Sequence, residues 1–391
     1  MARHICFIIN NVGEYHAARL NHCASSLAAS GDRVTVIEPA TGVRLYTHKQ
    51  RRADTLLRGV GHIRLHTAGR AVQTEWALWR ALMRQRPSHI FTIGYSDRLS
   101  AVALAYANLF RVPIFFMADS KADDQPRSRR GELVKSAVLR GFDGALVAGG
   151  RHRDYFRSLG MKGPIEIGFD VIDNAFFRRR AEKLLPRAGW LVRKGLLPER
   201  YVLCVSRLID RKRVDLALRI FAESGVAARG VRLLLIGSGP LDREIHEQAR
   251  ALGIADALCH HRNVRNTLMP LFYARADALI LASEYDQWGL CVNEAQAIGV
   301  PCIVTRRCGV AGEIVVHGKN GYVFDPGNAQ IAVDALRELV ANDDLRRSLG
   351  DAAAGTMERW GLPAFSGAVA RLVGAHPSDP AASAASKAFA A

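Results

Sequence analysis

Two carboxylates eight positions apart, Asp286 and Glu294, have the spacing in this sequence that most clearly indicates chemistry. Gly289 lies between them at an expected helix start, and the segment then passes through a Gly-Val-Pro turn into a short apolar strand. A loop carboxylate can accept hydrogen bonds from sugar hydroxyls, and the free backbone N–H groups of Trp288, Gly289 and Leu290 can face a diphosphate. The carboxylate of Glu294, further along the helix, can hold a ribose diol. Together these groups predict a site for a sugar nucleotide.

The run DQWGLCVNEAQAIGVPCI resembles the acidic motif of retaining glycosyltransferases of the GT-B fold, glycosyltransferase family 4 (glycosyl transferases group 1). That family's usual motif is E-x7-E, and Asp286 stands where the first glutamate usually stands, one methylene shorter. The resemblance implies that Asp286 positions the donor sugar and that Glu294 holds the ribose. The alternative is an amphipathic helix with an ordinary N-terminal acid and a glycine C-cap.

A basic run, VSRLIDRKRVDLAL, follows an expected strand at Tyr201–Ser206 and resembles the family's GRL-x-x-x-K-G-x-D-x-L segment. The resemblance implies that Arg207 and Lys212 grip the donor diphosphate, completing a catalytic set with Asp286 and Glu294, and that Ser206 lines the donor site. Two preorganised cations would stabilise the negative charge that grows on the leaving nucleoside diphosphate. The alternative is a basic first helical turn, which is unfavourable against the helix dipole.

Two glycine-containing turns complete the implied donor site. LLLIGSGPLDREI resembles the family's strand-to-helix turn, in which Gly237 would let the backbone pass close to the nucleotide. A plain turn is the alternative. In the N-terminal half the family usually carries two glycines after the first strand. This chain has NNVGEYHAAR, so the single Gly13 would allow the approach to the donor phosphate.

Acceptor contacts are expected from the N-terminal half. His16 and Arg19 lie three positions apart, on one face of the first expected helix. Asp119 follows the end of a strand, the place where ligands bind in parallel α/β sheets. These three residues are candidates for acceptor binding, and the alternatives are a surface histidine and a solvated acidic loop.

The elements that must hold these residues alternate between short apolar runs and helical stretches, which predicts an α/β fold with buried parallel strands. The expected strands are His4–Ile9, Arg33–Glu38, His89–Gly94, Pro113–Ala118, Gly144–Gly149, Tyr201–Ser206, Arg232–Gly237, Ala278–Ser283 and Cys302–Arg306. The resemblance implies the GT-B architecture, two Rossmann-like doubly wound domains facing across a cleft. The expected ranges are 1–185 for the acceptor-side domain with a crossover helix at about 358–373, 195–355 for the nucleotide-sugar donor domain, and 375–391 for a disordered tail. The stretch near Phe177–Arg200 is rich in Arg and Lys and is expected to connect the two domains.

Composition is that of an ordinary soluble protein, since 49% of the 391 residues are hydrophobic and 23% are charged. No apolar run approaches the roughly 18 residues of a membrane span, and the N-terminus lacks the pattern of a signal peptide. Seven cysteines without a C-x-x-C pair indicate reduced cytosolic thiols. The net charge is +17, and the first 200 residues hold nearly all of it, with 33 Lys and Arg against 17 Asp and Glu. Such a field attracts anionic partners, although a solvated basic surface explains it equally well.

The resemblance therefore implies a retaining glycosyltransferase that moves a sugar from a nucleoside-diphosphate sugar to a hydroxyl acceptor, in cell-envelope, exopolysaccharide or glycolipid biosynthesis. No cofactor or metal is expected, because two cations take the role of magnesium. The expected partners are a glycan, glycolipid or other hydroxyl acceptor and an anionic membrane surface, not nucleic acid. The expected location is cytoplasmic or peripheral at the inner face of the membrane. The alternatives are an epimerase-like enzyme of the same fold and a catalytically degenerate basic protein that binds membrane or nucleic acid.

Overall fold

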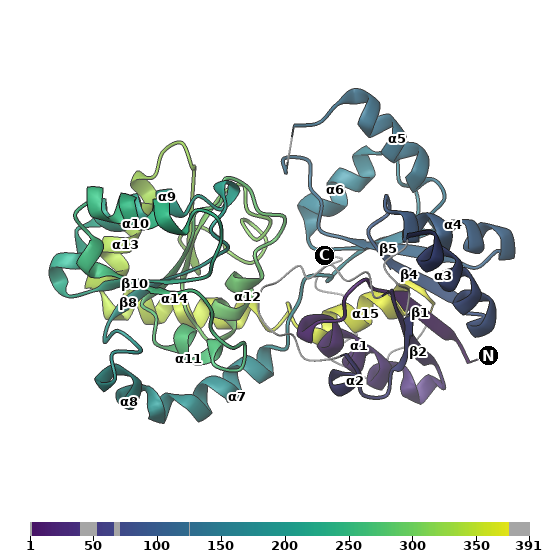
Figure 1. Cartoon of the computed structure of the whole chain (residues 1–391), viewed down its shortest axis with the longest axis horizontal. Helices are drawn as coiled ribbons and strands as arrows, with labels where there is room; N and C mark the ends of the chain where they lie inside the picture. Colours follow the sequence, from purple (N-terminus) through teal and green to yellow (C-terminus); the bar gives the residue numbers. More distant parts are fainter. Residues whose placement is uncertain (1, 40–52, 66–70, 125, 375–391) are drawn as a thin grey trace. The chain divides into compact units, whose positions relative to one another are not determined.

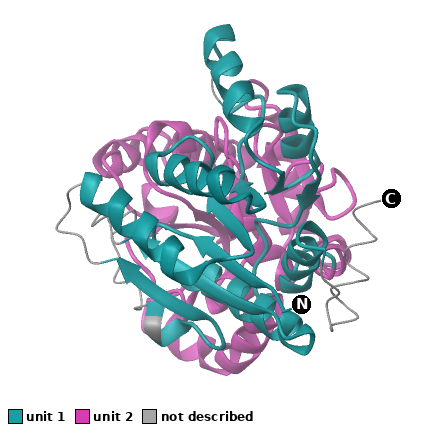
Figure 2. Cartoon of the chain, turned by 90° about the vertical axis from the view of Figure 1, so that its right-hand side faces the viewer, with its two compact units in different colours: residues 1–173, 359–391 teal, residues 174–358 magenta. Residues whose placement is uncertain are grey.

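The computed structural model describes residues 2–39, 53–65, 71–124 and 126–374. The chain divides into two compact units (Figure 2): unit 1 comprises Met1–Asp173 and Arg359–Ala391, and unit 2 comprises Asn174–Glu358. The expected tail at 375–391 lies outside the described residues. None of the described helices is long and apolar enough to span a membrane.

Unit 1 is built on a seven-stranded parallel sheet with the strand order β3-β2-β1-β4-β5-β6-β7. Its central strands are almost entirely buried, because helices cover both faces of the sheet. The strands are β1 (His4–Ile8), β2 (Arg33–Pro39), β3 (Gly61–Leu65), β4 (His89–Ile93), β5 (Ile114–Ala118), β6 (Gly144–Val147) and β7 (Ile165–Ile167).

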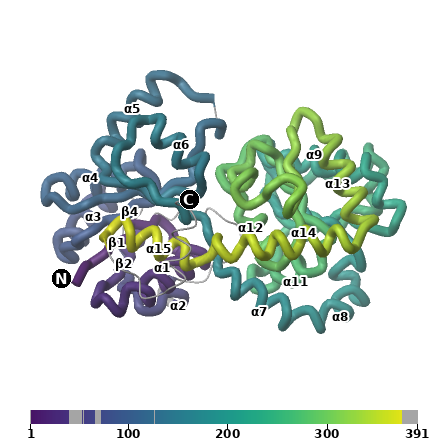
Figure 3. Tube along the Cα trace, turned by 180° about the vertical axis from the view of Figure 1, so that it is seen from behind, coloured from purple at the N-terminus to yellow at the C-terminus, as the bar shows by residue number. Residues whose placement is uncertain are grey.

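The helices of unit 1 lie on both faces of this sheet (Figure 1), with α1 and α15 on one face and α3 and α4 on the other. The helix α15 comes from the last part of the described chain yet lies beside α1 (Figure 3), where Nδ1 of His22 and the hydroxyl oxygen of Ser366 lie 2.7 Å apart. The helices are α1 (Glu14–Leu27), α2 (Ala53–Leu56), α3 (Ala71–Gln85), α4 (Arg98–Phe110), α5 (Arg129–Leu139), α6 (Gly150–Ser158) and α15 (Leu362–Leu372), with the 3-10 turn η1 (Ala28–Ser30).

Unit 2 repeats this design with a six-stranded parallel sheet in the order β10-β9-β8-β11-β12-β13. The strands are β8 (Tyr201–Val205), β9 (Arg232–Ile236), β10 (Leu258–His261), β11 (Ala278–Leu281), β12 (Cys302–Thr305) and β13 (Gly321–Phe324). All nine strands expected from the sequence are present, so the two doubly wound α/β units are confirmed.

The helices of unit 2 also form two layers (Figure 1), with α9, α10 and α13 on one face of the sheet and α7, α11, α12 and α14 on the other. The helix α9 packs on the sheet because its apolar positions recur at helical spacing, which buries Val214, Leu218 and Phe221 on one side. The helices are α7 (Asn174–Leu184), α8 (Ala188–Arg193), α9 (Val214–Ser224), α10 (Asp242–Ala251), α11 (Met269–Ala274), α12 (Leu290–Ala297), α13 (Gln330–Ala341) and α14 (Asp343–Thr356), with 3-10 turns η2 (Leu185–Arg187), η3 (Asp210–Lys212), η4 (Val226–Arg229) and η5 (Ala255–Ala257).

The boundary between the units differs from the expected one. The stretch expected to connect two domains, Phe177–Arg200, is largely helical and belongs to unit 2. Arg178 of α7 donates hydrogen bonds to the carbonyl oxygens of Ala297 (2.8 Å) and Ala354 (3.1 Å), which ties α7 to that unit. Unit 1 therefore ends at Asp173 rather than near residue 185.

Candidate functional site

The candidate site of unit 2 lies where the strand order reverses direction. β8 and β11 are neighbours, and the chain builds outward from them in opposite directions, through β9 and β10 on one side and β12 and β13 on the other. Parallel α/β sheets bind ligands at the carboxyl ends of the strands flanking such a switch point. The loop after β8 carries Arg207 and Lys212, and the loop after β11 carries the segment from Asp286 to Leu290.

Lys212 and Asp286, predicted from separate motifs 74 positions apart, meet at this point. The ammonium group of Lys212 donates to Oδ2 of Asp286, and the hydroxyl of Ser283 donates to the same oxygen at 3.4 Å. The guanidinium of Arg211 approaches Oδ1 to 3.9 Å. Only 13% of the Lys212 side chain and 11% of the Asp286 side chain are exposed. Because both charges are largely desolvated, removing Lys212 leaves the Asp286 carboxylate with only the more distant Arg211 and the Ser283 hydroxyl as partners.

Arg207 behaves differently from Lys212. It is exposed, and no hydrogen bond or ion pair joins it to Lys212 or Asp286 within the described part of the chain. Its guanidinium is thus able to move toward an anion at the mouth of the site. Arg213, which stands where the family pattern has a glycine, adopts the left-handed φ of 45° that glycine would favour. Its charge is already matched by Asp215 at 2.9 Å and Glu284 at 3.4 Å.

The start of α12 is shaped by Gly289 and Trp288. Gly289 caps the helix with a φ of 121°, and a Cβ at this position would lie 2.9 Å from Leu281. The indole of Trp288 is buried and donates to Oδ1 of Asn293 at 2.8 Å, so its side chain anchors the turn. Leu290 begins the helix, where N–H groups lack an i−4 carbonyl partner.

Glu294 lies one turn further along α12 and is only 5% exposed. Its carboxylate accepts a hydrogen bond from the hydroxyl of Tyr273 on α11. This contact holds the carboxylate in a fixed orientation at the base of the site. Nothing in the sequence pairs these two residues, which lie 21 positions apart.

Gly237 and Ser206 are brought together, but the glycine serves the packing of two loops. Gly237 has a φ of 148°, and a Cβ there would lie 1.8 Å from the carbonyl oxygen of Ser206. Gly239 is similar, since its Cβ would lie 2.3 Å from the carbonyl oxygen of Leu208. The N–H of Ser206 donates to Ile236 at 3.0 Å. The close approach that requires glycine here is between the loops after β8 and β9, and the expected contact of Gly237 with a nucleotide stays a prediction.

In unit 1, Gly13 is the N-cap of α1 with a φ of −86°, a conformation open to any residue. Its N–H donates to the carbonyl oxygen of Asn11 at 3.1 Å, and the neighbouring N–H of Val12 donates to Glu38 at 2.9 Å. The loop after β1 is thus held by its own hydrogen bonds. The conformation of Gly13 does not itself require glycine, and the expected approach of the donor phosphate stays a prediction.

His16 and Arg19 share one face of α1, where both contact Phe169. The ring centroids of His16 and Phe169 are 6.4 Å apart, and the guanidinium of Arg19 lies 5.2 Å from the Phe169 ring. Arg19 is 2% exposed, donates to the carbonyl oxygen of Val171 at 2.8 Å and lies 3.4 Å from Asp170. Its expected acceptor contact is therefore corrected to a structural role. Burial, with the nearby charge of Arg19, lowers the pKa of His16 to about 3, so its ring is neutral at physiological pH.

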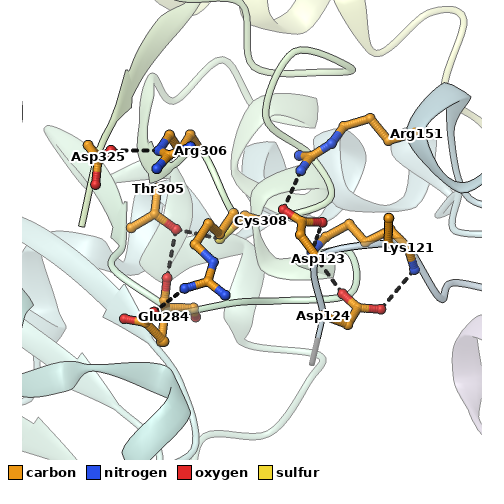
Figure 4. A network of polar contacts seen from close by, with 12 residues as sticks. Lys121, Asp123, Asp124, Arg151, Glu284, Thr305, Arg306, Cys308 and Asp325 are labelled. Carbon is orange, nitrogen blue, oxygen red and sulfur yellow. Dashed lines mark hydrogen bonds and ion pairs between the residues drawn. The ribbon is translucent and has the colours of Figure 1, made fainter. Parts of the chain in front are cut away.

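Asp119 lies at the end of β5 and is partly buried. The loop that follows it is not a freely solvated acidic loop. Lys121 is fully buried, and its Nζ lies 2.8 Å from a carboxylate oxygen of Asp124 and 3.1 Å from one of Asp123. The guanidinium of Arg151 lies 2.7 Å from the other carboxylate oxygen of Asp123 (Figure 4). These ion pairs give the loop a defined shape beside Asp119.

Four residues of the unit 2 site were missed from the sequence. Ser283 and Arg211 both approach Asp286. The hydroxyl of Tyr273 donates to Glu294. Glu284, labelled in Figure 4, forms ion pairs with both Arg213 and Arg307. Arg211 had a signal, since it directly precedes Lys212 in the run Arg-Lys-Arg. Tyr273 and Glu284 lie outside any motif, so only the fold reveals them.

Known proteins resemble this chain in sequence and in fold. Residues 193–356 match the family model described as Glycosyl transferases group 1. The chain is 32% identical over 155 residues to N-acetyl-alpha-D-glucosaminyl L-malate synthase of Bacillus anthracis, covering 40% of each protein. It is also 32% identical over 183 residues to a GDP-mannose-dependent alpha-(1-6)-phosphatidylinositol monomannoside mannosyltransferase of Mycolicibacterium smegmatis, covering 45% of this chain and 47% of that protein. The matched stretches thus span less than half the length of these curated relatives.

The whole chain resembles solved structures more completely. HepE from Anabaena, solved in complex with UDP and glucose, aligns with a TM-score of 0.73 over 95% of this chain and 99% of its own, at 14% identity. At such low identity the likeness concerns the fold. With the two parallel-sheet units, it shows that this chain has the GT-B fold of glycosyltransferases, with a glycosyl transferases group 1 match in its second half.

Proposed function

We propose that this protein is a retaining glycosyltransferase that moves a sugar from a nucleoside-diphosphate sugar to a hydroxyl acceptor. The observation that carries the proposal is the meeting of Lys212 and Asp286 at the β8/β11 switch point. A cation for the leaving diphosphate and a carboxylate for the sugar hydroxyls stand there side by side. A relative named as GDP-mannose-dependent and a structural neighbour solved in complex with UDP-glucose support it.

In the proposed mechanism, Lys212 and Arg207 stabilise the negative charge that develops on the departing diphosphate, with the backbone N–H groups from Trp288 to Leu290 facing it. Asp286 positions the sugar through its hydroxyls. When the donor binds, the diphosphate becomes the new partner of Lys212 and the sugar hydroxyls become partners of Asp286. The buried ion pair thereby holds both groups in place before the donor arrives.

The remaining roles follow from the positions of the other candidates. Glu294, oriented by Tyr273, holds the ribose diol, and the loops of Ser206 and Gly237 border the nucleotide. His16 and Asp119 are the candidates left for the acceptor. Retention of configuration fits front-face displacement, in which the leaving phosphate helps to deprotonate the acceptor hydroxyl. The reaction requires no metal, because Arg207 and Lys212 take that role.

The acceptor is proposed to be a glycan or glycolipid of the cell envelope or of an exopolysaccharide, met at the cytoplasmic face of a membrane. The support is the excess positive charge of the first 200 residues and the phosphatidylinositol-linked acceptor named for one relative. Basic side chains near an anionic leaflet each contribute about 1 kcal/mol to binding. A few such contacts would give reversible attachment.

The direct test is a thermal-shift screen of UDP-, GDP-, ADP- and dTDP-sugars. The true donor must raise the melting temperature because it binds only the native state. Release of the nucleoside diphosphate is then followed with acceptor present, and the anomeric configuration of the product is read by NMR. Retained configuration in a glycosidic product supports the proposal. An epimerised free sugar nucleotide, or no shift and no release with any donor, would overturn it.

A further inference from the structure

A cluster of two histidines and one carboxylate lies at the side of the unit 2 sheet, away from the residues assigned to the donor sugar. Asp242 and His246 are four positions apart on one face of α10, and His260 lies on the neighbouring strand β10. His246 Nε2 lies 3.0 Å from His260 Nδ1 and 3.9 Å from Asp242 Oδ1. All three ligand atoms lie within 4.8 Å of one another.

The hydrogen bond on the far side of His260 fixes which nitrogen carries its proton. His260 Nε2 lies 2.8 Å from the carbonyl oxygen of Gly237. A carbonyl oxygen can only accept, so Nε2 donates, and the lone pair of a neutral ring stands on Nδ1, facing His246. Metal-bound histidines commonly donate their second N–H to a backbone carbonyl in this way. Partial burial also lowers the pKa of His260, which favours the neutral ring.

We propose that Asp242, His246 and His260 form a binding site for a divalent transition-metal ion such as Zn²⁺. The ligands would be His260 Nδ1, Asp242 Oδ1 and His246 Nε2, with water in an open fourth position. His246 Nε2 donates its proton to His260 Nδ1 in the metal-free protein, so metal binding requires the His246 tautomer that carries its proton on Nδ1 instead. Two imidazoles and a carboxylate are donors that Zn²⁺ accepts. Bond lengths of about 2.0–2.1 Å at a tetrahedral angle put two nitrogens about 3.3 Å apart. The two rings therefore need to separate by only a few tenths of an ångström.

Arg262 is the group that competes with the metal. Its guanidinium binds both oxygens of Asp242 at 2.8 Å, and this contact lowers the pKa of the carboxyl group. Arg262 itself is largely exposed, so it can release Oδ1 and remain on Oδ2, where it would act as an outer partner of the bound carboxylate. The ion would then join α10 to β10 and, through His260, to the turn at Gly237. This site is separate from the proposed sugar transfer, which needs no metal.

The test is Zn²⁺ binding to the full-length protein after chelator treatment, measured by isothermal titration calorimetry and by the melting temperature. We expect one Zn²⁺ per chain and a higher melting temperature with the metal. His246→Gln should weaken binding by at least about tenfold, the lower end of the loss seen when the support of a metal ligand is removed. The matched control is His261→Gln, because His261 adjoins the cluster and bonds to the Leu196 carbonyl oxygen instead.

Cobalt substitution distinguishes this site from binding by thiols, since the half-buried Cys259 lies on the same strand. Co²⁺ held by nitrogen and oxygen gives visible d–d bands without a thiolate charge-transfer band. Melting of the metal-free His246→Gln variant shows whether it remains folded, and Asp242→Asn serves as the second variant if it does not. The proposal is overturned by no binding to the wild type, by equal affinity in the variants and the wild type, or by a thiolate band.

Discussion

The pair of Lys212 and Asp286 explains how a ligand-free site keeps two opposite charges in a poorly solvated place. Each ion alone would pay several kcal/mol for desolvation, which the partner offsets. The pair also fixes the loops after β8 and β11 relative to each other. Loss of Lys212 should thus affect stability as well as the proposed chemistry, whereas loss of the exposed Arg207 should affect the proposed chemistry alone.

This difference gives a prediction for two cation variants. Arg207→Ala and Lys212→Ala should each lower turnover by roughly 10²–10³, the scale for losing one preorganised charge partner in the transition state. Only Lys212→Ala should also lower the free energy of unfolding, by about 3 kcal/mol, because Asp286 is left buried without its partner. Steady-state kinetics and urea denaturation measure the two effects. Near wild-type turnover in both variants would show that the donor-site assignment is wrong.

The two carboxylates should also differ from each other. Glu294→Gln should weaken binding of the nucleoside diphosphate alone, because Glu294 is assigned to the ribose. Asp286→Asn should impair sugar transfer while leaving diphosphate binding nearly intact, since Lys212 remains available. Calorimetry with the free diphosphate separates them. An equal loss of diphosphate affinity in both variants contradicts the division of roles.

Among the elements, the turn after β9 is the one most constrained by packing. A Cβ at Gly237 would lie 1.8 Å from the Ser206 carbonyl oxygen, a distance at which the backbone must shift. Gly237→Ala should therefore destabilise unit 2 by about 1–3 kcal/mol and weaken donor binding. Thermal denaturation and donor titration give the two readouts.

The matched control for this variant is Gly355→Ala on the exposed side of α14, where nothing lies within 4 Å of an added Cβ. Alanine in a helix loses less conformational freedom than glycine, so this change should be neutral or stabilise by about 0.5–1 kcal/mol. If Gly237→Ala were as stable as this control, the two loops would not be in the close contact described.

The elements themselves were largely predictable from the sequence. Runs such as His4–Ile8 and Arg232–Ile236 are apolar, short and bounded by turn residues, which is the pattern of parallel strands buried on both faces. The helix start at Gly289 was likewise predictable from the glycine itself. Such local signals do not depend on the rest of the fold.

Pairings between distant residues were not predictable in the same way. A basic run does not reveal that Lys212 meets Asp286 while Arg213 meets Asp215 and Glu284. The position of Arg19 on a helix face indicated a ligand, yet the face is covered by Phe169 and the Val171 carbonyl oxygen. The stretch that contains α7 was expected to connect the domains because it is rich in Arg and Lys, although Arg178 donates to carbonyl oxygens of α12 and α14. These outcomes are set by packing partners far away in the chain.

For the whole molecule, the uneven charge is the property that bears on where it acts. Arg129 and Arg130 begin α5 and are exposed, and Leu133 and Val134 on the same helix are exposed as well. Basic and apolar side chains together on one helix are suited to the surface of an anionic bilayer. Arg127, by contrast, donates to the Tyr155 hydroxyl and to the carbonyl oxygen of Lys121, so it belongs to the structure of unit 1.

The corresponding prediction is that the protein floats with anionic vesicles and not with neutral ones at low salt. The attraction should fade as salt rises, because the Debye length falls to about 8 Å at physiological ionic strength and about 3 Å at 1 M.

The double variant Arg129→Gln and Arg130→Gln should lose about 2 kcal/mol of binding, roughly 30-fold in the partition constant. The matched control, Arg243→Gln with Arg347→Gln, removes the same charge from exposed positions of unit 2. If the control loses as much binding, the attraction comes from net charge rather than from α5. If neutral vesicles bind equally well, the attraction does not depend on charge, and if neither kind of vesicle binds, a soluble acceptor becomes the better hypothesis.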